Sequence, residues 1–339
     1  MNAKRKLLFI VNPISGGTKK KIVLDAIELN IDSAKYDWEI SYTSYKGHAK
    51  ELSLKAVEDK YDVVAAIGGD GTVNEIASTL INTDTALAII PCGSGNGLAR
   101  HLHIPLQYTK AVELINRFDV KAIDYGTINE RPFFCTCGMG FDAYISAKFD
   151  KSLKRGALAY VENAVREVIN YKPETYTLIN EDGTEMTYKA FCVTFANASQ
   201  YGNNVYIAPK ASMEDGLIDV TVIEPFNYAE APILAIQFMN GILPSKSTVK
   251  MFQARKLTIH REKEDYLHCD GEPFHGGKEV VVEAHPHSLK VVINKNAKIK
   301  PITLIQSLSI IFRNKLYANT ILGQTISNSS KEILEKIKI

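Results

Sequence analysis

The sequence has few cysteines and no segment suited to a membrane span or a signal peptide. The five cysteines include no Cys-x-x-Cys pair, which argues against a zinc site and for small buried thiols in a reducing compartment. Uncharged stretches such as 231–245 contain Pro, Asn and Gln and are shorter than the roughly 20 apolar residues that cross a bilayer. The N-terminal apolar run, Leu7–Val11, is too short for a signal-peptide core. We therefore expect a cytoplasmic protein.

An excess of charge of one sign is also missing, because the formal net charge is only +2 over 339 residues. From Lys290 to the C-terminus there are nine Lys or Arg and two acids, a net of +7, which leaves about −5 for residues 1–289. Such a main body excludes nucleic acid as a partner on charge grounds. With 45% hydrophobic and 23% charged residues, the composition excludes a disordered, collagen-like or coiled-coil chain, and the length favours two domains.

The first third of the chain alternates apolar strands with helical patterns, which predicts an α/β domain over residues 1–125. Strands are expected at Leu7–Val11, Trp38–Thr43, Val63–Ile67 and Ala86–Ile90, and helices at His48–Lys60, Asn74–Leu80 and Ala111–Asn116. Strands that are apolar on both faces and separated by helices are typical of a parallel sheet covered by helices. In such a sheet the ligand crevice lies at the loops that follow the strands.

From residue 126 to about 295 the pattern changes to short strands separated by turns, which predicts an antiparallel, sandwich-like β domain. Strands are expected at Tyr176–Ile179, Tyr188–Phe195, Leu217–Ile223, Lys256–His260, Lys278–Glu283 and Leu289–Ile293, and helices near Leu158–Tyr171 and Tyr228–Leu243. Residues 181–184 (EDGT), between the first two strands, predict a hairpin turn. Residues 296–339 form a basic, amphipathic C-terminal extension.

The strongest local motif is residues 68–72 (GGDGT), placed between a buried strand and the start of a helix. Glycines let the backbone approach a phosphate closely, and a helix N-terminus presents free N–H groups to an anion. A carboxylate among phosphates is repulsive unless it binds Mg²⁺ or a substrate hydroxyl, so Asp70 indicates a nucleotide–metal site. The alternative is a plain Asp-Gly turn that caps a helix.

Two further glycine-rich loops follow neighbouring strands. Residues 12–17 (NPISGG) follow the first strand, and residues 91–97 (PCGSGNG) follow the fourth. Neither is a P-loop, because no Gly-Lys-Ser/Thr occurs, and the second is not a dinucleotide fingerprint, because residue 98 is Leu. Three phosphate-type loops at neighbouring strand ends point to a nucleotide site far more strongly than any one of them.

In order and spacing, these loops resemble those of the catalytic domain shared by diacylglycerol kinases, sphingosine kinases and bacterial lipid kinases. The resemblance spans residues 6 to 294 and continues at Thr43 with His48, Asp124–Gly126, Gly138–Asp142, Asp215–Asp219 and Asp270–Glu272. It implies a phosphofructokinase-like α/β nucleotide domain followed by a β-rich lipid domain, with ATP in the cleft. The function it implies is the ATP-dependent phosphorylation of a hydroxyl on a membrane lipid.

The resemblance also implies roles for individual residues. The catalytic positions would be Asp70, Glu272 and Asp124. The nucleotide-site positions would be Asn12, Pro13, Ile14, Ser15, Gly16, Thr43, Gly69, Asp70, Gly71, Thr72, Val73, Asn74, Glu75, Ser94, Gly95 and Asn96. A structural Mg²⁺ would be held by Asp215 with backbone oxygens of Ser212 and Leu217. Such an oxygen-rich set suits a hard cation, and an ordinary Asp-Gly turn is the alternative.

Two questions stay open at this stage. The sphingosine-kinase branch assigns the base to Asp70, whereas the bacterial branch assigns it to Glu272. Many bacterial diacylglycerol kinases have Asp after the position of Asn96. This chain has Gly97 there, and its Asn-Gly-Leu run is more similar to that of the sphingoid-base kinases. Asp215 and Glu272 favour diacylglycerol and Gly97 favours a sphingoid base, so we expect a slight preference for diacylglycerol. A homodimer is left open.

Other functions share parts of this pattern. NAD kinases and phosphofructokinases also use Gly-Gly-Asp-Gly and act on a soluble hydroxyl, but the loops at 12–17 and 91–97 argue against them. A catalytically inactive nucleotide or lipid sensor is disfavoured by the intact Asp70, Asp124 and Glu272. Residues 301–339 carry an apolar helical stripe beside basic residues, which suits peripheral association with the inner face of the membrane. The alternative is that this stripe packs on the nucleotide domain.

Overall fold

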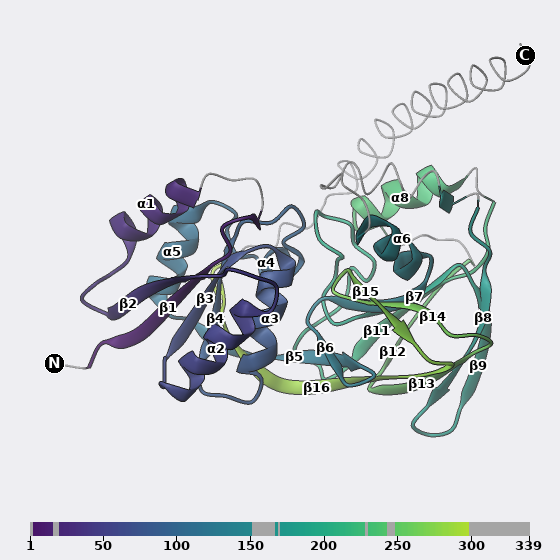
Figure 1. Cartoon of the computed structure of the whole chain (residues 1–339). Helices are drawn as coiled ribbons and strands as arrows, with labels where there is room; N and C mark the ends of the chain where they lie inside the picture. The colour runs from purple at the N-terminus through teal and green to yellow at the C-terminus, as the bar shows by residue number, and fades with distance from the viewer. Residues whose placement is uncertain are drawn as a thin grey trace, which may run out of the picture.

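The computed structural model describes residues 3–15, 20–150, 167–168, 170–227, 230–242 and 248–297, and it has an α/β half and a β half (Figure 1). The α/β half contains β1 (Arg5–Val11), α1 (Lys20–Asn30), β2 (Tyr36–Tyr42), α2 (His48–Glu58), β3 (Val63–Gly68), α3 (Asp70–Leu80), β4 (Ala86–Pro91), α4 (Gly97–His101) and α5 (Tyr108–Arg117). Strands and helices follow one another in the order that the apolar runs predicted, so the expected α/β fold is confirmed.

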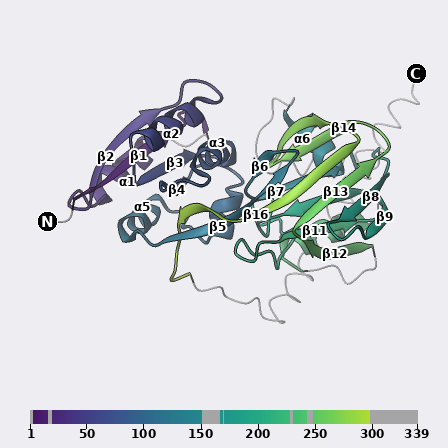
Figure 2. The same ribbon diagram turned by 90° about the horizontal axis from the view of Figure 1, so that it is seen from below.

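The first four strands form a parallel sheet in the order β2-β1-β3-β4. Every residue of β3 and β4 is buried, because helices cover both faces of the sheet. On one side α1 lies beside α5, and on the other α2 lies beside α3 (Figure 2). All four strands end at the same edge of the sheet, and the loops that follow them are neighbours there.

The β half is an antiparallel sandwich. It contains β5 (Val120–Ile128), β6 (Arg131–Phe133), β7 (Thr136–Gly140), α6 (Phe141–Asp150), β8 (Glu174–Asn180), β9 (Glu185–Ala190), β10 (Cys192–Ala196), β11 (Ile218–Ile223), α8 (Ala231–Met239), β12 (Val249–Ala254), β13 (Lys256–Arg261), β14 (Asp265–Cys269), β15 (Glu272–Gly276) and β16 (Glu279–Val292). The sheet β12-β11-β10-β7-β14-β15 packs on β13-β8-β9 through an apolar cluster that includes Phe133, Tyr176, Phe195 and Leu257. The expected sandwich-like β domain is therefore confirmed.

One strand, β16, runs through both halves. It pairs antiparallel with β13 and β5 and reaches β4 in parallel, and its register with β5 shifts between His285 and Leu289. The prediction of two separate strands over 278–293 was wrong. Pro286 and the left-handed His287 (φ 52°) form a bulge inside a single strand, because β5 pairs with the chain on both sides of them.

The chain changes sheet at Phe191, where the sequence predicted one strand over 188–195. β9 pairs with β8 in the long sheet, whereas β10 pairs with β11 in the six-stranded sheet. Phe191 lies between them and packs on Phe141 and Phe226, with ring centroids 4.4 and 5.0 Å away. The β8–β9 hairpin itself is as expected, with Gly183 at φ 81° in its turn.

Several helical predictions differ from the structure or lie beyond it. α6 and the β14–β15 hairpin were not predicted, and α8 is shorter than the helix expected near 228–243. Most of the helix expected at 158–171 and the amphipathic stripe of 301–339 lie outside the described residues.

In the described part of the chain, no helix combines the length and apolar character needed to cross a membrane. All five cysteines are free thiols, and four of them are buried.

Candidate active site

The loops after β3 and β4 contact each other through glycines. An ideal Cβ at Gly93 would lie 2.6 Å from Cα of Gly69, and one at Gly68 would lie 2.5 Å from the side chain of Thr72. A side chain at either position would displace its neighbour, so only glycine fits. β3 therefore passes directly into α3, and the N-terminus of this helix, with its free N–H groups, lies against the loop after β4.

The carboxylate of Asp70 is held by backbone N–H groups of that opposite loop. Its two oxygens accept hydrogen bonds from Asn96 N at 2.9 Å and Gly97 N at 2.6 Å. An ideal Cβ at Gly95 would lie 2.7 Å from the carboxylate, so this position also needs glycine. Burial raises the pKa of Asp70, and the hydrogen bonds from Gly97 and Asn96 oppose this rise. A half-buried carboxylate between two phosphate-type loops is suited to bind a metal ion or a hydroxyl group.

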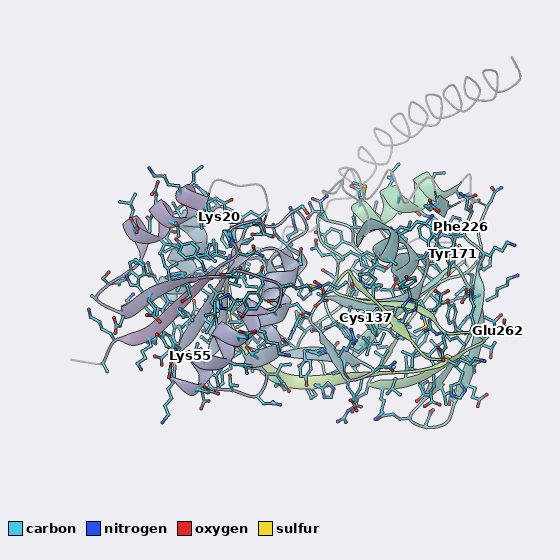
Figure 3. The ribbon with its side chains drawn as sticks, in the orientation of Figure 1. Lys20, Lys55, Cys137, Tyr171, Phe226 and Glu262 are labelled. Atoms are coloured by element: carbon cyan, nitrogen blue, oxygen red, sulfur yellow. The ribbon has the colours of Figure 1, made fainter. Side chains whose placement is uncertain are left out.

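The loop after β1 reaches the same place through Asn12. Its Nδ2 donates to Oγ1 of Thr72 at 3.0 Å, and its Oδ1 accepts the N–H of Ile14 at 3.1 Å. Ser15 is held in turn by Lys20, at the start of α1 (Figure 3), whose Nζ lies 2.9 Å from both the hydroxyl and the carbonyl oxygen of Ser15. Burial lowers the pKa of Lys20.

The remaining predicted nucleotide positions surround this group. Thr43 is buried and donates its N–H to the carbonyl of Val11 at 2.9 Å. Asn96 fixes its own loop, since its side chain accepts the N–H of Gly93 at 2.9 Å and donates to the Gly93 carbonyl at 2.7 Å. Three other predicted positions are exposed, namely Pro13, Ile14 and Ser94. Val73 is buried, and Gly16 lies outside the described residues.

The second turn of α3 also contacts both neighbouring segments. Glu75 Oε1 accepts the N–H of Gly47, in the loop after β2, at 3.0 Å. Asn74 Nδ2 donates to Oδ2 of Asp270, in the β14–β15 turn, at 2.8 Å. Asp270 has a left-handed backbone (φ 48°) and also accepts the N–H groups of residues 134–136 at 2.8 to 3.0 Å. Asp270 thus joins the β half to the helix that carries Asp70.

Glu272 follows this turn at the start of β15 and reaches the first turn of α3. Its Oε1 would lie 3.3 Å from an ideal Cβ at Gly71. Its Oε2 accepts a hydrogen bond from Nζ of Lys46 at 2.9 Å, and the two side chains are 56% and 79% exposed. Two of the predicted catalytic carboxylates, Asp70 and Glu272, therefore lie beside Gly71. Lys46 was not predicted, because its partner is distant in the sequence.

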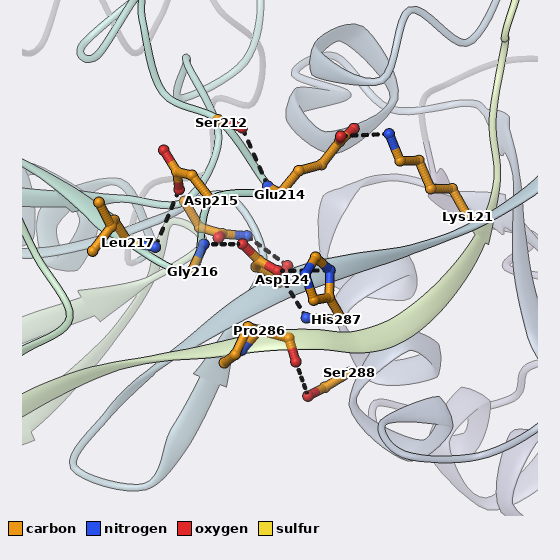
Figure 4. A network of polar contacts seen from close by, with 11 residues as sticks. Lys121, Asp124, Ser212, Glu214, Asp215, Gly216, Leu217, Pro286, His287 and Ser288 are labelled. Carbon is orange, nitrogen blue, oxygen red and sulfur yellow. Dashed lines mark hydrogen bonds and ion pairs between the residues drawn. The ribbon is translucent and has the colours of Figure 1, made fainter.

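The third predicted catalytic residue, Asp124, belongs to a different group of contacts (Figure 4). It is fully buried in β5. Its oxygens accept the N–H of Gly216 at 2.7 Å and the N–H of His287, in the β16 bulge, at 2.8 Å. In this structure Asp124 therefore holds a loop of the β half against β16.

That loop carries the predicted metal ligands. Asp215 Oδ1 accepts the N–H of Leu217 at 3.1 Å, and Nε2 of Gln253 lies 3.2 Å from the carboxylates of both Asp215 and Asp219. Among the residues that the structure describes, no three His, Cys, Asp or Glu side chains gather as metal ligands. The predicted set, one carboxylate with the carbonyl oxygens of Ser212 and Leu217, consists of oxygen alone and fits a hard cation such as Mg²⁺.

A loop of the β half closes over the glycine-rich loop after β4, and the sequence did not predict this contact. The carbonyl of Gly95 accepts hydrogen bonds from Asn203 N at 2.9 Å and from Nε of Arg100 at 3.0 Å. Arg100 also donates to Oδ1 of Asn204 at 3.0 Å. Gly202 (φ 114°) approaches so closely that an ideal Cβ would lie 3.1 Å from Gly95. A Gly-Asn-Asn turn marks this loop in the sequence but does not reveal its partner.

Comparison with known proteins brings these features together. Residues 6–128 match the diacylglycerol kinase catalytic domain, and residues 135–293 match the YegS C-terminal NAD kinase beta sandwich-like domain. The chain is 30% identical over 236 residues to a probable YegS-like lipid kinase of Chromohalobacter salexigens, covering 68% of this chain and 76% of that protein. It is 28% identical over 275 residues to the diacylglycerol kinase of Bacillus subtilis, covering 79% of this chain and 90% of that protein.

A solved structure has the same fold. The crystal structure of a diacylglycerol kinase from Bacillus anthracis covers 87% of this chain and 99% of its own, with a TM-score of 0.68 at 21% identity. The matched catalytic domain and the glycine-rich loops of the α/β half define a kinase. The chain belongs to the family of diacylglycerol kinases and YegS-like lipid kinases. The resemblance drawn from the sequence motifs is confirmed.

Proposed function

We propose that this protein transfers the γ-phosphoryl group of ATP to a hydroxyl group of a membrane lipid, with Mg²⁺. The observation that carries the proposal is the position of Glu272 beside Gly71, where its Oε1 would lie 3.3 Å from an ideal Cβ built on that glycine. Through it, a carboxylate of the β half lies at the first turn of α3, next to Asp70. A proton acceptor from the β half, Glu272, thus lies beside a phosphate-type loop of the α/β half. Relatives named diacylglycerol kinase and lipid kinase support this proposal.

The three glycine-rich loops supply the nucleotide site in this proposal. The free N–H groups at the start of α3 and the close approach that glycines permit favour phosphate oxygens. Asn12 and Ser15 form one wall, and Asn96 forms the other. Asp70 organises the Mg²⁺ that accompanies ATP. Because phosphoryl transfer depends mostly on positioning and charge neutralisation, this fixed geometry is the main contribution of the α/β half.

Glu272 is the proposed proton acceptor. Asp70 already accepts two backbone N–H groups, whereas Glu272 is exposed and bonded only to a side chain at the surface. The bond between phosphorus and ADP breaks, the lipid oxygen bonds to phosphorus, and the hydroxyl proton passes to Glu272. Glu272→Gln should lower kcat by at least about 100-fold, the usual scale for a general base. Glu279→Gln, at an exposed acid on β16, is the matched control and should keep wild-type kcat.

A structural Mg²⁺ is proposed at Asp215, with the carbonyl oxygens of Ser212 and Leu217. The ion would neutralise the acidic side chains of this loop when bound. Asp124 would support such a site, because its carboxylate accepts the N–H of Gly216 at 2.7 Å and so holds the loop in place. We therefore propose a positioning role for Asp124 rather than direct contact with the substrate.

The proposed acceptor is diacylglycerol, slightly ahead of a sphingoid base, and the proposed place of reaction is the inner face of the membrane. One assay tests this choice: purified protein with Mg-ATP and, as acceptors, diacylglycerol, monoacylglycerol, sphinganine, ceramide and NAD. Phosphorylation of diacylglycerol above the others supports the proposal. Activity on sphinganine that greatly exceeds that on diacylglycerol would reverse the order, and phosphorylation of NAD alone would refute a lipid acceptor.

A further inference from the structure

The two halves are joined beside Gly71 by the ion pair of Lys46 and Glu272, with Nζ 2.9 Å from Oε2. Lys46 lies in the loop after β2 and Glu272 begins β15, and 226 positions separate them in the sequence. An exposed ion pair contributes little to stability, so stability alone does not explain a lysine at this place. What distinguishes the pair is that one of its partners is the proposed base.

The loop that carries Lys46 is fixed to the α/β half on both sides. Before it, the N–H of Thr43 donates to the Val11 carbonyl at 2.9 Å. After it, the N–H of Gly47 donates to Glu75 on α3 at 3.0 Å. The backbone of Lys46 is therefore held near the second turn of α3. Its side chain is exposed, and a lysine side chain is a mobile point charge on a flexible stem.

Two other cations near the phosphate-type loops, Lys20 and Arg100, bind groups of the protein itself. Lys20 donates to the hydroxyl and carbonyl oxygens of Ser15. Arg100 donates to the carbonyl of Gly95 and to the side chain of Asn204. Within the described ranges, Lys46 is the cation that contacts the proposed base. Transfer of a phosphoryl group needs positive charge at the oxygens of the moving group, and Lys46 is placed to supply it.

We propose that Lys46 is a further catalytic residue of the transfer. It pairs with Glu272 before the lipid arrives. When the acceptor hydroxyl bonds to Glu272, the ammonium group of Lys46 moves to the oxygens of the γ-phosphoryl group. There it neutralises charge while the bond to ADP breaks and the bond to the lipid oxygen forms, and Glu272 takes the hydroxyl proton. This inference rests on the proposed function and adds a group to it.

The test compares Lys46→Met, Lys46→Arg and Lys55→Met in the full-length protein, with Mg-ATP and the best acceptor lipid in mixed micelles. Lys55 is an exposed lysine on α2, away from β15 (Figure 3), and serves as the matched control. We expect Lys46→Met to lower kcat by about 100-fold, the scale for losing one charge-stabilising group, with KM for ATP changed less than about threefold. Lys46→Arg should keep most of the activity, and Lys55→Met should equal wild type. Melting midpoints verify that every variant is folded.

A second comparison separates direct contact with phosphate from an effect through Glu272. If Lys46 acts on the phosphoryl group, Lys46→Met lowers the residual rate of Glu272→Gln still further. Equal rates for Glu272→Gln with and without Lys46→Met would overturn the inference, and so would a wild-type kcat for Lys46→Met alone. Wild-type protein that phosphorylates none of the acceptors would instead refute the proposed function, and the inference with it.

Discussion

Asn74 on α3 and Asp270 in the β14–β15 turn share a hydrogen bond of 2.8 Å that joins the helix of the phosphate-type loop to the strand of the proposed base. Asp270 is half-buried, and its carboxylate also accepts the N–H groups of residues 134–136. Glu272 follows two positions later. The place of Glu272 beside Gly71 therefore depends on how firmly Asp270 is held.

Asn74→Ala should weaken both the fold and the reaction. The change removes one donor from the half-buried carboxylate of Asp270, which costs about 1–3 kcal/mol of unfolding free energy. It also frees the β14–β15 turn from α3, so kcat should fall several-fold while KM for ATP changes little. Urea unfolding and steady-state kinetics measure the two effects. Ser78→Ala is the control on the same helix, since its hydroxyl bonds only to the Glu75 carbonyl; equal results for both variants would contradict the prediction.

Asp70→Asn should abolish phosphoryl transfer and change how stability depends on pH. Burial raises the pKa of Asp70, so its ionisation is less favourable in the folded protein than in the unfolded chain. That cost is absent below the ordinary aspartate pKa of about 3.9 and grows as pH rises through the folded pKa. The stability of Asp70→Asn relative to wild type should therefore increase as pH rises above about 4. Thermal unfolding at several pH values measures this, and near wild-type turnover would refute the role of Asp70.

Removal of Mg²⁺ should destabilise the wild-type protein through the loop at 212–217. A ligand that binds only the folded state raises the unfolding free energy by an amount set by its concentration and Kd. The melting midpoint in Mg²⁺ should thus exceed that in EDTA by several degrees, without ATP. Asp215→Asn should lose most of this difference. Glu214→Gln, at a neighbouring acid paired with Lys121, should keep it, and equal shifts in the two variants would place the ion elsewhere.

His101 should make the fold sensitive to mild acid. Burial, with a smaller contribution from His103, lowers the pKa of His101 to about 4, and its Nδ1 accepts the N–H of Ser199 at 3.0 Å. An unfolded histidine titrates near 6.5, so between about pH 6.5 and 4 the unfolded chain binds a proton that the folded protein does not. As pH falls across this window, the unfolding free energy should decrease by on the order of 3 kcal/mol. His101→Gln should flatten the fall, whereas His260→Gln, at an exposed ring, should not.

The phosphate-type loops could be predicted from the sequence because their geometry is local. At residues 68–72 a buried strand, the glycines and the helix start are adjacent in the chain, and a close approach of backbones requires glycine whatever surrounds it. The β8–β9 hairpin was predictable for the same reason, since Gly183 supplies the left-handed turn.

The contacts that complete the site could not be predicted, because they depend on distant partners. Lys46 and Glu272 are 226 positions apart, and no pattern near either residue indicates the other. Whether Pro286 and His287 form a turn or a bulge depends on the pairing of β5 on both sides. The change of sheet at Phe191 depends on aromatic rings from two other segments. In each case tertiary packing overrides the local pattern.

The continuity of β16 limits how the molecule can open. Because this strand pairs with β4 at one end, with β13 at the other and with β5 on both sides of its bulge, it connects the two halves directly. A wide swing of one half away from the other would break ladder hydrogen bonds along a whole strand. The register shift between His285 and Leu289 is the place where these pairings are already interrupted, so we expect the strand to bend there. Access for a bulky lipid must then come from bending of this strand and from movement of the loops near Gly71 and Glu272. The two halves would deform together rather than separate.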